Sequence, residues 1–162
     1  PLDVIIPRKV GAPGNQELAV GAVAPDGTAI YDERALSMMG LQQTDLQDEV
    51  ARQINEIERR TKSYRGSREP LSLRGKTAIV VDDGIATGLT AKAALRSVRN
   101  QEPKTLVLAV PVTTMEAAVE LRKDIDELVC LLVPEIFYAV GQFYEDFSQT
   151  TDEEVAALLN SG

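Results

Sequence analysis

The chain has no histidine, no tryptophan and a single cysteine, Cys130, among its 162 residues. The absence of histidine excludes His-based acid–base catalysis, Ser–His and Cys–His nucleophiles and the usual zinc ligands. A lone cysteine excludes an intrachain disulfide, so we expect a reducing, cytoplasmic location. Because Cys130 lies in the apolar run LVCLLV, its thiol is expected to be buried and inert.

Long apolar runs and an excess of positive charge are also missing. No segment approaches the ~20 apolar residues of a membrane span, and the N-terminus does not resemble a signal peptide. The net charge of −8 argues against a nucleic-acid surface, which is normally basic. We therefore expect neither a membrane nor a nucleic acid as partner. The length predicts a single domain over residues 1–162.

The most informative stretch is KTAIVVDDGIATGLT, residues 76–90. Its apolar run Ala78–Val81 predicts a buried strand. Asp82 and Asp83 follow directly, and residues 84–90 form a loop rich in Gly and Thr. Apolar residues at helical spacing after the loop predict a helix that begins near Thr90. Such a strand–loop–helix unit predicts a ligand site at the carboxyl end of a strand in an open α/β sheet.

The residue types of this loop indicate what it binds. A helix N-terminus offers free N–H groups and a positive dipole end to an anion. Gly84 and Gly88 allow close backbone approach and positive φ, and Thr87 and Thr90 add hydroxyl donors. The two carboxylates accept from hydroxyl groups or bind a hard cation. The residues therefore predict a ligand with a phosphate and vicinal hydroxyls, such as a ribose 5-phosphate. The P-loop and GxGxxG patterns are both absent.

The string VVDDGIATGLT closely resembles the phosphoribosyl pyrophosphate (PRPP) motif of the type I phosphoribosyltransferases. The resemblance implies that Asp82 and Asp83 are the catalytic acidic pair, which holds the 2′ and 3′ hydroxyls of the ribose. It implies that the 5′-phosphate is bound by the loop residues Gly84, Ile85, Ala86, Thr87, Gly88, Leu89 and Thr90. The commonest family form has Gly where this chain has Leu89, a change that keeps the backbone N–H.

The same resemblance implies the fold and the reaction. The fold would be α/β, a Rossmann-like, doubly wound, mainly parallel sheet with a small hairpin and hood region. Its core would cover about residues 1–133, and the hood and tail about residues 134–162. The reaction would use PRPP and Mg²⁺, transfer the phosphoribosyl group to a nitrogen base and release pyrophosphate. No residue stands out as a metal ligand on its own, and a homodimer is an expected assembly. Ala86 replaces an Asp of the 6-oxopurine enzymes, which argues against hypoxanthine or guanine as the base.

The motif does not separate this enzyme from a non-catalytic, PRPP-binding regulatory protein, which would share the loop. A phosphate-binding α/β domain unrelated to PRPP is a weaker alternative. The whole arrangement resembles a bacterial group of predicted phosphoribosyltransferases with no assigned base. The family's first core strand and its pyrophosphate loop would lie before Val4, and they have no counterpart in this sequence.

The N-terminal segment carries a second candidate anion contact. Val4–Ile6 predict a short buried strand, after which Arg8 and Lys9 would stand at its carboxyl end. In the family a basic residue or pair at this place contacts pyrophosphate, whereas a solvated basic turn is an equally good interpretation. Residues 17–30 predict a hairpin that turns at Pro25-Asp26-Gly27. This hairpin and the loop 11–16 would form either a mobile lid or a static surface feature.

Helices are predicted over residues 44–64, 114–124 and 151–159, and strands over 105–110 and 128–133. The first two helices would start with capping boxes, Thr44 with Gln47 and Thr113 with Glu116. Met115, Ala118 and Val119 are expected to face inward. The basic residues of the connection that follows the first helix are expected to be solvated: Arg65, Arg68 and Arg74.

Aromatic residues are scarce, yet five of the seven lie in PEIFYAVGQFYEDF, residues 134–147. Such a cluster can close a core or stack on a flat base. The stretch faintly resembles the hood of the 6-oxopurine phosphoribosyltransferases, which makes Phe137 a weak candidate for base binding.

Overall fold

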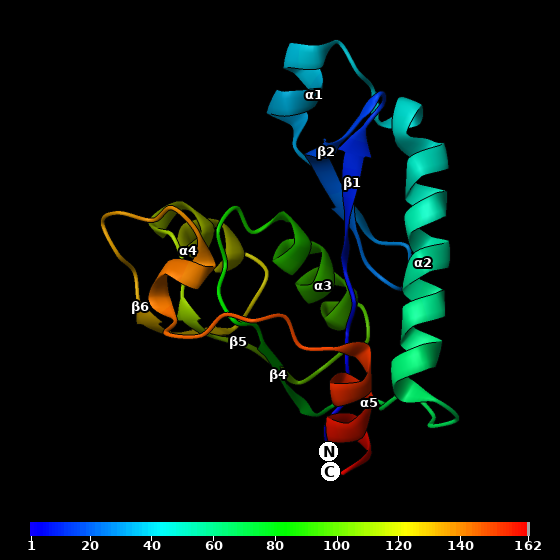
Figure 1. The fold of residues 1–162 in the computed structure, drawn as a ribbon, viewed down its shortest axis with the longest axis vertical. Helices are drawn as coiled ribbons and strands as arrows, with labels where there is room; N and C mark the ends of the chain where they lie inside the picture. Colours follow the sequence, from blue (N-terminus) through cyan, green and yellow to red (C-terminus); the bar gives the residue numbers. More distant parts are fainter. Residues whose placement is uncertain (162) are drawn as a thin grey trace. The chain divides into compact units, whose positions relative to one another are not determined.

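The computed structural model describes residues 1–161, which divide into two compact units. Unit 1 contains Pro1–Leu71 and the C-terminal residues from Thr150 on, and unit 2 contains Ser72–Gln149. Each unit has its own sheet (Figure 1). That the whole chain forms a single domain stays a prediction.

Unit 1 is an antiparallel sheet packed against a long helix (Figure 1). Its elements are β1 (Arg8–Ala12), β2 (Asn15–Val23), β3 (Ala29–Tyr31), α1 (Glu33–Met39), the 3₁₀ helix η1 (Gln43–Leu46), α2 (Gln47–Arg65) and α5 (Asp152–Asn160). The sheet order is β1-β2-β3, and α2 contacts β1, β2 and α5. The buried core of this unit comes from both sheet and helices: Val10, Ala12, Val20, Val23, Leu36, Leu46 and Ile57.

The hairpin predicted over residues 17–30 is confirmed by the antiparallel pairing of β2 with β3, with the Gly27 N–H donating to the Ala24 carbonyl in the turn. The strand predicted at Val4–Ile6 is wrong, because β1 begins only at Arg8. Arg8 pairs with Val23, the last residue of β2. No strand within residues 1–161 pairs with Val4–Ile6, and an apolar run without a ladder partner does not form a strand.

The long helix predicted over residues 44–64 is confirmed as η1 followed by α2, but its predicted cap is wrong. The N–H of Gln42 donates to the Asp45 carboxylate at 2.8 Å, so the capping box begins two residues before Thr44. The predicted C-terminal helix is confirmed as α5, in which Thr151 and Glu154 form the capping box.

Two arginines that were expected to be solvated bind parts of unit 1 that are distant in the sequence. Arg65 donates to both carboxylate oxygens of Asp3, and Arg68 donates to the carbonyl of Leu159. Burial alone would raise the pKa of the Asp3 carboxyl, but hydrogen bonds from the Val4 amide, Arg65 and the Leu71 amide lower it below its usual value. These contacts hold the N-terminal residues to the C-terminal end of α2.

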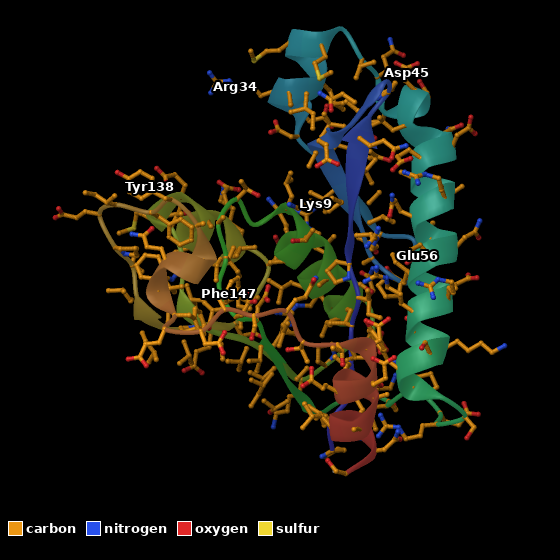
Figure 2. All side chains as sticks on the ribbon, in the orientation of Figure 1. Lys9, Arg34, Asp45, Glu56, Tyr138 and Phe147 are labelled. Carbon is orange, nitrogen blue, oxygen red and sulfur yellow. The ribbon has the colours of Figure 1, made fainter. Side chains whose placement is uncertain are left out.

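Acidification is expected to weaken α2 through Glu56, which accepts from Arg59 and Arg60 (Figure 2). The hydrogen bonds from these two arginines lower the pKa of Glu56 from 4.5 to about 2. A lowered carboxyl pKa stabilises the folded state above pH 4.5, and that contribution is lost as the pH falls towards 2. Glu56→Gln should therefore lower the Tm at pH 6 and leave it unchanged near pH 2, as followed by circular dichroism. Glu58→Gln on the same helix is the control, and an equal pH profile for both variants would contradict the assignment.

Unit 2 is a parallel sheet with helical crossovers. Its elements are β4 (Thr77–Val81), α3 (Leu89–Arg99), β5 (Thr105–Val112), α4 (Met115–Leu121), β6 (Glu127–Leu132) and the 3₁₀ helix η2 (Val140–Phe143). The order β4-β5-β6 follows the chain, and both strand pairs are parallel. Helices α3 and α4 lie on the same side of this sheet (Figure 1). The α/β class with a parallel sheet is thus confirmed, and so are the strands expected near residues 105–110 and 128–133.

The other face of the parallel sheet is open, which contradicts the expected burial of the strand before Asp82. Ile79 is 61% exposed and Val81 is 73% exposed, although both belong to an apolar run. Leu131 of β6 is 83% exposed on its strand, and Cys130 is half-buried, with its thiol near the Leu132 carbonyl. The composition of an apolar run predicts a strand. Whether one or both faces of that strand are buried depends on the helices that pack against the sheet.

Helix α4 has its cap one residue later than predicted, and it buries a different face. The cap is Thr114, whose hydroxyl accepts from the Ala117 N–H, and not the predicted Thr113. Ala117, Ala118 and Leu121 face inward, whereas Met115 and Val119 are exposed, which makes two of the three predicted inward residues wrong. Ala117 and Ala118 lie four and three residues before Leu121, so these side chains share one face of α4, and what packs against the helix decides which face is buried. Across residues 1–161, no helix combines the length and hydrophobicity that crossing a bilayer requires.

Candidate phosphate and ribose site at the carboxyl end of β4

The loop after β4 is anchored at Ile85. This residue is 3% exposed, forms a parallel bridge with Thr113, and donates its N–H to the Val112 carbonyl at 3.0 Å. Its own carbonyl accepts from the Thr114 N–H at 3.3 Å. Ile85 therefore fixes the loop across the end of β5, and its amide is already used within the fold. Of the expected phosphate-binding residues, Ile85 is the one whose backbone donor is engaged.

Asp82 and Asp83 lie side by side at the end of β4, both exposed. An oxygen of the Asp82 carboxylate accepts from the Asp83 N–H at 2.9 Å, which orients this side chain. Partial desolvation is the main cause that raises the pKa of Asp82. The hydrogen bond from the Asp83 amide lowers this pKa, whereas the charge of Asp83 raises it further. The pair thus concentrates negative charge and acceptor oxygens where hydroxyl donors or a cation would relieve the repulsion.

The remaining loop residues present unused donors. Within residues 1–161, the backbone N–H groups of five consecutive residues form no hydrogen bond with the protein: Ala86, Thr87, Gly88, Leu89 and Thr90. The first intrahelical bond of α3 runs from the Lys92 N–H to the Gly88 carbonyl at 2.8 Å. The positive end of the dipole of an 11-residue helix lies at the same place. A row of free amides at a helix N-terminus is a site for an anion.

The two glycines of the loop are needed for different reasons. Gly88 has φ of 84°, the left-handed conformation expected for it from the sequence. Gly84 does not have positive φ, contrary to expectation. A Cβ at Gly84 would lie 2.7 Å from Cγ1 of Val140 and 2.9 Å from Cγ1 of Val112. Gly84 is therefore required because the chain packs closely against β5 and the C-terminal part of unit 2.

Thr114 also holds the loop, a contact that was missed because it joins residues far apart in the sequence. Its hydroxyl donates to the Ala86 carbonyl at 3.0 Å while it accepts from the Ala117 N–H at 3.1 Å. Ala86 is thus oriented with its carbonyl towards α4, which leaves its N–H free. The place of Thr114 after the strand predicted over residues 105–110 indicated that it borders the ligand crevice, but gave no sign of a contact with Ala86.

The aromatic segment of unit 2 forms two ring pairs. Phe137 and Phe143 have centroids 5.4 Å apart, and Tyr144 and Phe147 have centroids 5.1 Å apart. Phe137, the candidate for base stacking, is half-buried in its pair, whereas Tyr138 is 84% exposed (Figure 2). A role of Phe137 in base binding stays a prediction.

Arg8 and Lys9, the candidate pyrophosphate contacts, belong to unit 1 and point to opposite faces of β1. Arg8 donates from Nε to Gln53 at 2.9 Å, and the buried Gln53 donates to Glu49 at 2.7 Å. Lys9 is exposed, and no hydrogen bond or ion pair involves its ammonium within residues 1–161 (Figure 2). The sequence could not separate the two residues. In the structure Arg8 has one donor engaged by the neutral amide of Gln53, whereas the Lys9 ammonium has no such partner within residues 1–161.

Among the described residues 1–161, no group of three or more Asp, Glu, Cys or His side chains could hold a metal ion. The carboxylates that this loop contributes are the adjacent Asp82 and Asp83. This suits Mg²⁺, which is commonly held by one or two carboxylates together with substrate phosphates, and does not suit a cation that needs a cage of protein ligands.

Comparison with known proteins agrees with this geometry. Residues 8–148 match the model of the phosphoribosyl transferase domain. The chain belongs to the phosphoribosyl transferase family. It is 40% identical over 160 residues to the "Putative phosphoribosyl transferase Rv0571c" of Mycobacterium tuberculosis strain H37Rv and to its counterpart MT0597 in strain CDC 1551.

These alignments cover 99% of this chain but 36% of each relative, so the chain spans about a third of the curated relatives that it matches. The crystal structure of TT1426 from Thermus thermophilus is 42% identical and superposes with a TM-score of 0.78. It is matched over 99% of this chain and 76% of its own. The likeness thus extends over both units of the chain, and supports the type I phosphoribosyltransferase fold.

Proposed function

We propose that this protein binds PRPP together with Mg²⁺ and transfers its phosphoribosyl group to a nitrogen base. One observation carries the proposal: two adjacent carboxylates, of which Asp82 is oriented by a hydrogen bond, are followed, after Gly84 and Ile85, by five free backbone amides at the N-terminus of α3. A ligand with hydroxyls beside a phosphate satisfies both groups at once, and a phosphoribosyl group has this arrangement. Membership in the phosphoribosyl transferase family supports it.

Each group in the site has a separate task. The amides of residues 86–90 and the hydroxyls of Thr87 and Thr90 donate to the 5′-phosphate, while Asp82 and Asp83 accept from the ribose hydroxyls. Mg²⁺, when bound, neutralises charge on the pyrophosphate. The protein residues hold the sugar in one orientation, which lowers the barrier by positioning.

The reaction balances without a co-reactant. The bond between C1 of the ribose and the pyrophosphate oxygen breaks, and pyrophosphate leaves with the electron pair. The base nitrogen forms the new bond to C1 and gives up a proton. The transition state carries oxocarbenium character, as in glycoside cleavage. The neighbouring negative charge of Asp82 and Asp83 favours such a cation at the sugar.

Thermal unfolding with added ligands tests the binding step. PRPP with Mg²⁺ should raise the Tm more than ribose 5-phosphate does, and inorganic phosphate should raise it least. A ligand at ~100 times its Kd adds about 2.7 kcal/mol to the free energy of unfolding. Equal shifts with all three ligands would indicate a phosphate-binding domain instead, and no shift with any of them would reject the site.

Turnover separates the enzyme from a PRPP-binding regulator, which would use the same loop. Pyrophosphate release is measured with PRPP, Mg²⁺ and a panel of purine, pyrimidine and pyridine bases. Release that depends on one base supports the transferase. PRPP binding without release for any base would favour the regulator.

Lys9 and Arg8 are expected to differ in effect, because only the Arg8 side chain is bound within unit 1. If Lys9 contacts the pyrophosphate, Lys9→Met should weaken PRPP binding about tenfold, as for a lost charged hydrogen bond, without affecting ribose 5-phosphate. Arg8→Met should lower the Tm through the loss of its bond to Gln53 and the exposure of that buried amide. Isothermal titration and thermal melts measure the two effects. Equal PRPP affinity for Lys9→Met and wild type would remove Lys9 from the site.

A further inference from the structure

The aromatic C-terminal segment of unit 2 returns to the loop after β4. The Tyr144 hydroxyl donates to the carbonyl oxygen of Asp83 at 2.6 Å, over a separation of 61 residues. The next residue, Gly84, lies against the side chain of Val140. Both residues that flank the Asp83–Gly84 peptide bond are therefore contacted by one segment of the chain.

This peptide bond joins the two halves of the site. On one side the Asp82 carboxylate accepts from the Asp83 N–H, and on the other Ile85 is held by the Val112 carbonyl. Between these two anchors the backbone of Asp83 and Gly84 can turn about its own dihedrals, and such a turn would redirect the Asp83 side chain. A hydrogen bond to the Asp83 carbonyl restricts that turn.

The Tyr144 ring is itself held in place. It pairs with Phe147, whose ring lies over Gly141 so closely that a Cβ there would be 2.8 Å from Cδ1 of Phe147. Tyr144 retains 37% exposure, so the ring is not part of a closed core. Within residues 1–161, no other side chain from outside the acidic pair forms a hydrogen bond with the backbone of Asp82 or Asp83.

We propose that Tyr144 is a positioning residue for the ribose end of the site: its hydroxyl fixes the Asp83–Gly84 peptide and thereby the direction of the Asp83 carboxylate. The inference rests on the proposed function. The free amides of residues 86–90 lie beyond the Ile85 anchor, so the phosphate end does not depend on this contact. Loss of the hydroxyl should therefore separate ribose binding from phosphate binding, which general loosening of unit 2 would not do.

Tyr144→Phe tests this, because it removes the hydroxyl and keeps the ring pair with Phe147. Affinities are measured by calorimetry for PRPP with Mg²⁺, ribose 5-phosphate and inorganic phosphate. We expect about a fivefold loss for both ribose ligands, the range of one neutral hydrogen bond, and less than about a twofold change for phosphate. Tyr138→Phe is the matched control, since it makes the same change on an exposed ring of the same segment, and should leave all three affinities unchanged.

Two outcomes would overturn the proposal: unchanged affinity for the ribose ligands in Tyr144→Phe, or an equal loss for all three ligands. Hydrogen exchange of the free protein tests the positioning role of Tyr144 without any ligand. The amide of Asp83 should exchange faster in Tyr144→Phe than in wild type, whereas that of Ile85, held by the Val112 carbonyl, should be unchanged. Neither amide should change in Tyr138→Phe. If wild type binds no ribose ligand, the proposed function fails, and an unchanged exchange rate at Asp83 would separately reject the positioning role.

Discussion

Replacing Asp82 and Asp83 together by Asn is expected to abolish PRPP binding while the protein stays folded. Each carboxylate would lose charged hydrogen bonds to a ribose hydroxyl, worth about 1.5–3 kcal/mol apiece, so PRPP affinity should fall at least about 100-fold. Inorganic phosphate, which we propose binds the amides of residues 86–90, should be retained. Calorimetry with both ligands measures the difference.

The stability of this double variant is a second part of the same prediction. Because partial desolvation and the neighbouring charge raise the pKa of Asp82, the folded state holds this carboxylate less favourably than the unfolded state does. A raised carboxyl pKa reduces stability at pH values above it, and the penalty disappears as the pH falls. The Asn variant should thus have a Tm at neutral pH no lower than that of wild type.

Glu127→Gln with Glu135→Gln is the matched control for the acidic pair. Both glutamates are exposed in unit 2, and the control changes the net charge by the same amount. It should leave PRPP affinity unchanged within a factor of about two. If the Asn variant keeps full PRPP affinity, or if the control loses as much, the ribose assignment is wrong.

Removal of the Thr87 and Thr90 hydroxyls is expected to weaken every phosphate-bearing ligand equally. Thr→Val keeps the branched shape and a similar helix propensity, so neither the loop nor the start of α3 should change. Each lost hydrogen bond to a charged phosphate is worth about 1.5–3 kcal/mol, or at least about tenfold in Kd. The double variant should therefore bind inorganic phosphate, ribose 5-phosphate and PRPP about 100-fold less tightly.

Two further variants control this experiment. Thr87→Ser with Thr90→Ser keeps both hydroxyls and should restore most of the affinity. Thr77→Val makes the same change at an exposed position on β4 and should have no effect. Normal phosphate affinity in the Val double variant would show that the backbone amides alone hold the phosphate. A loss confined to PRPP would mean that the two hydroxyls contact another part of the ligand.

Together these variants assign the two ends of the ligand independently. The acidic pair should govern the ligands that contain ribose, whereas the hydroxyls should govern all ligands that contain phosphate. Tyr144→Phe should follow the pattern of the acidic pair, with a smaller effect. A protein that merely bound phosphate would show the second pattern without the first.

Much of the site was predictable because its residues are contiguous. The strand, the acidic pair, the loop and the helix start are encoded within residues 76–90, and the structure places them as expected, including positive φ at Gly88. Local sequence determines such features because strand propensity, glycine conformation and the exposed amides of a helix N-terminus depend on neighbouring residues. The hairpin turn near Gly27 and the capping box of α5 were predictable for the same reason.

Predictions that needed a partner from elsewhere in the chain were less accurate. Val4–Ile6 has the composition of a strand but lacks a ladder partner within residues 1–161, and β4 is apolar but open on one face. Arg65 and Arg68 looked like surface charges, yet they bind Asp3 and the Leu159 carbonyl. Composition determines what a segment can form, whereas burial and pairing depend on what packs beside it.

By itself, then, the sequence determined the family motif and the α/β class, and it predicted a site for phosphate and vicinal hydroxyls. Only the tertiary structure decided which groups are free to act. The Ile85 amide donates to the Val112 carbonyl, whereas the backbone amides of residues 86–90 are free. Arg8 donates to Gln53, whereas the Lys9 ammonium forms no hydrogen bond or ion pair within residues 1–161. The fold also brings the Tyr144 hydroxyl to the Asp83 carbonyl. Each of these outcomes is a contact between residues separated along the chain, and such contacts arise only when the whole chain has packed.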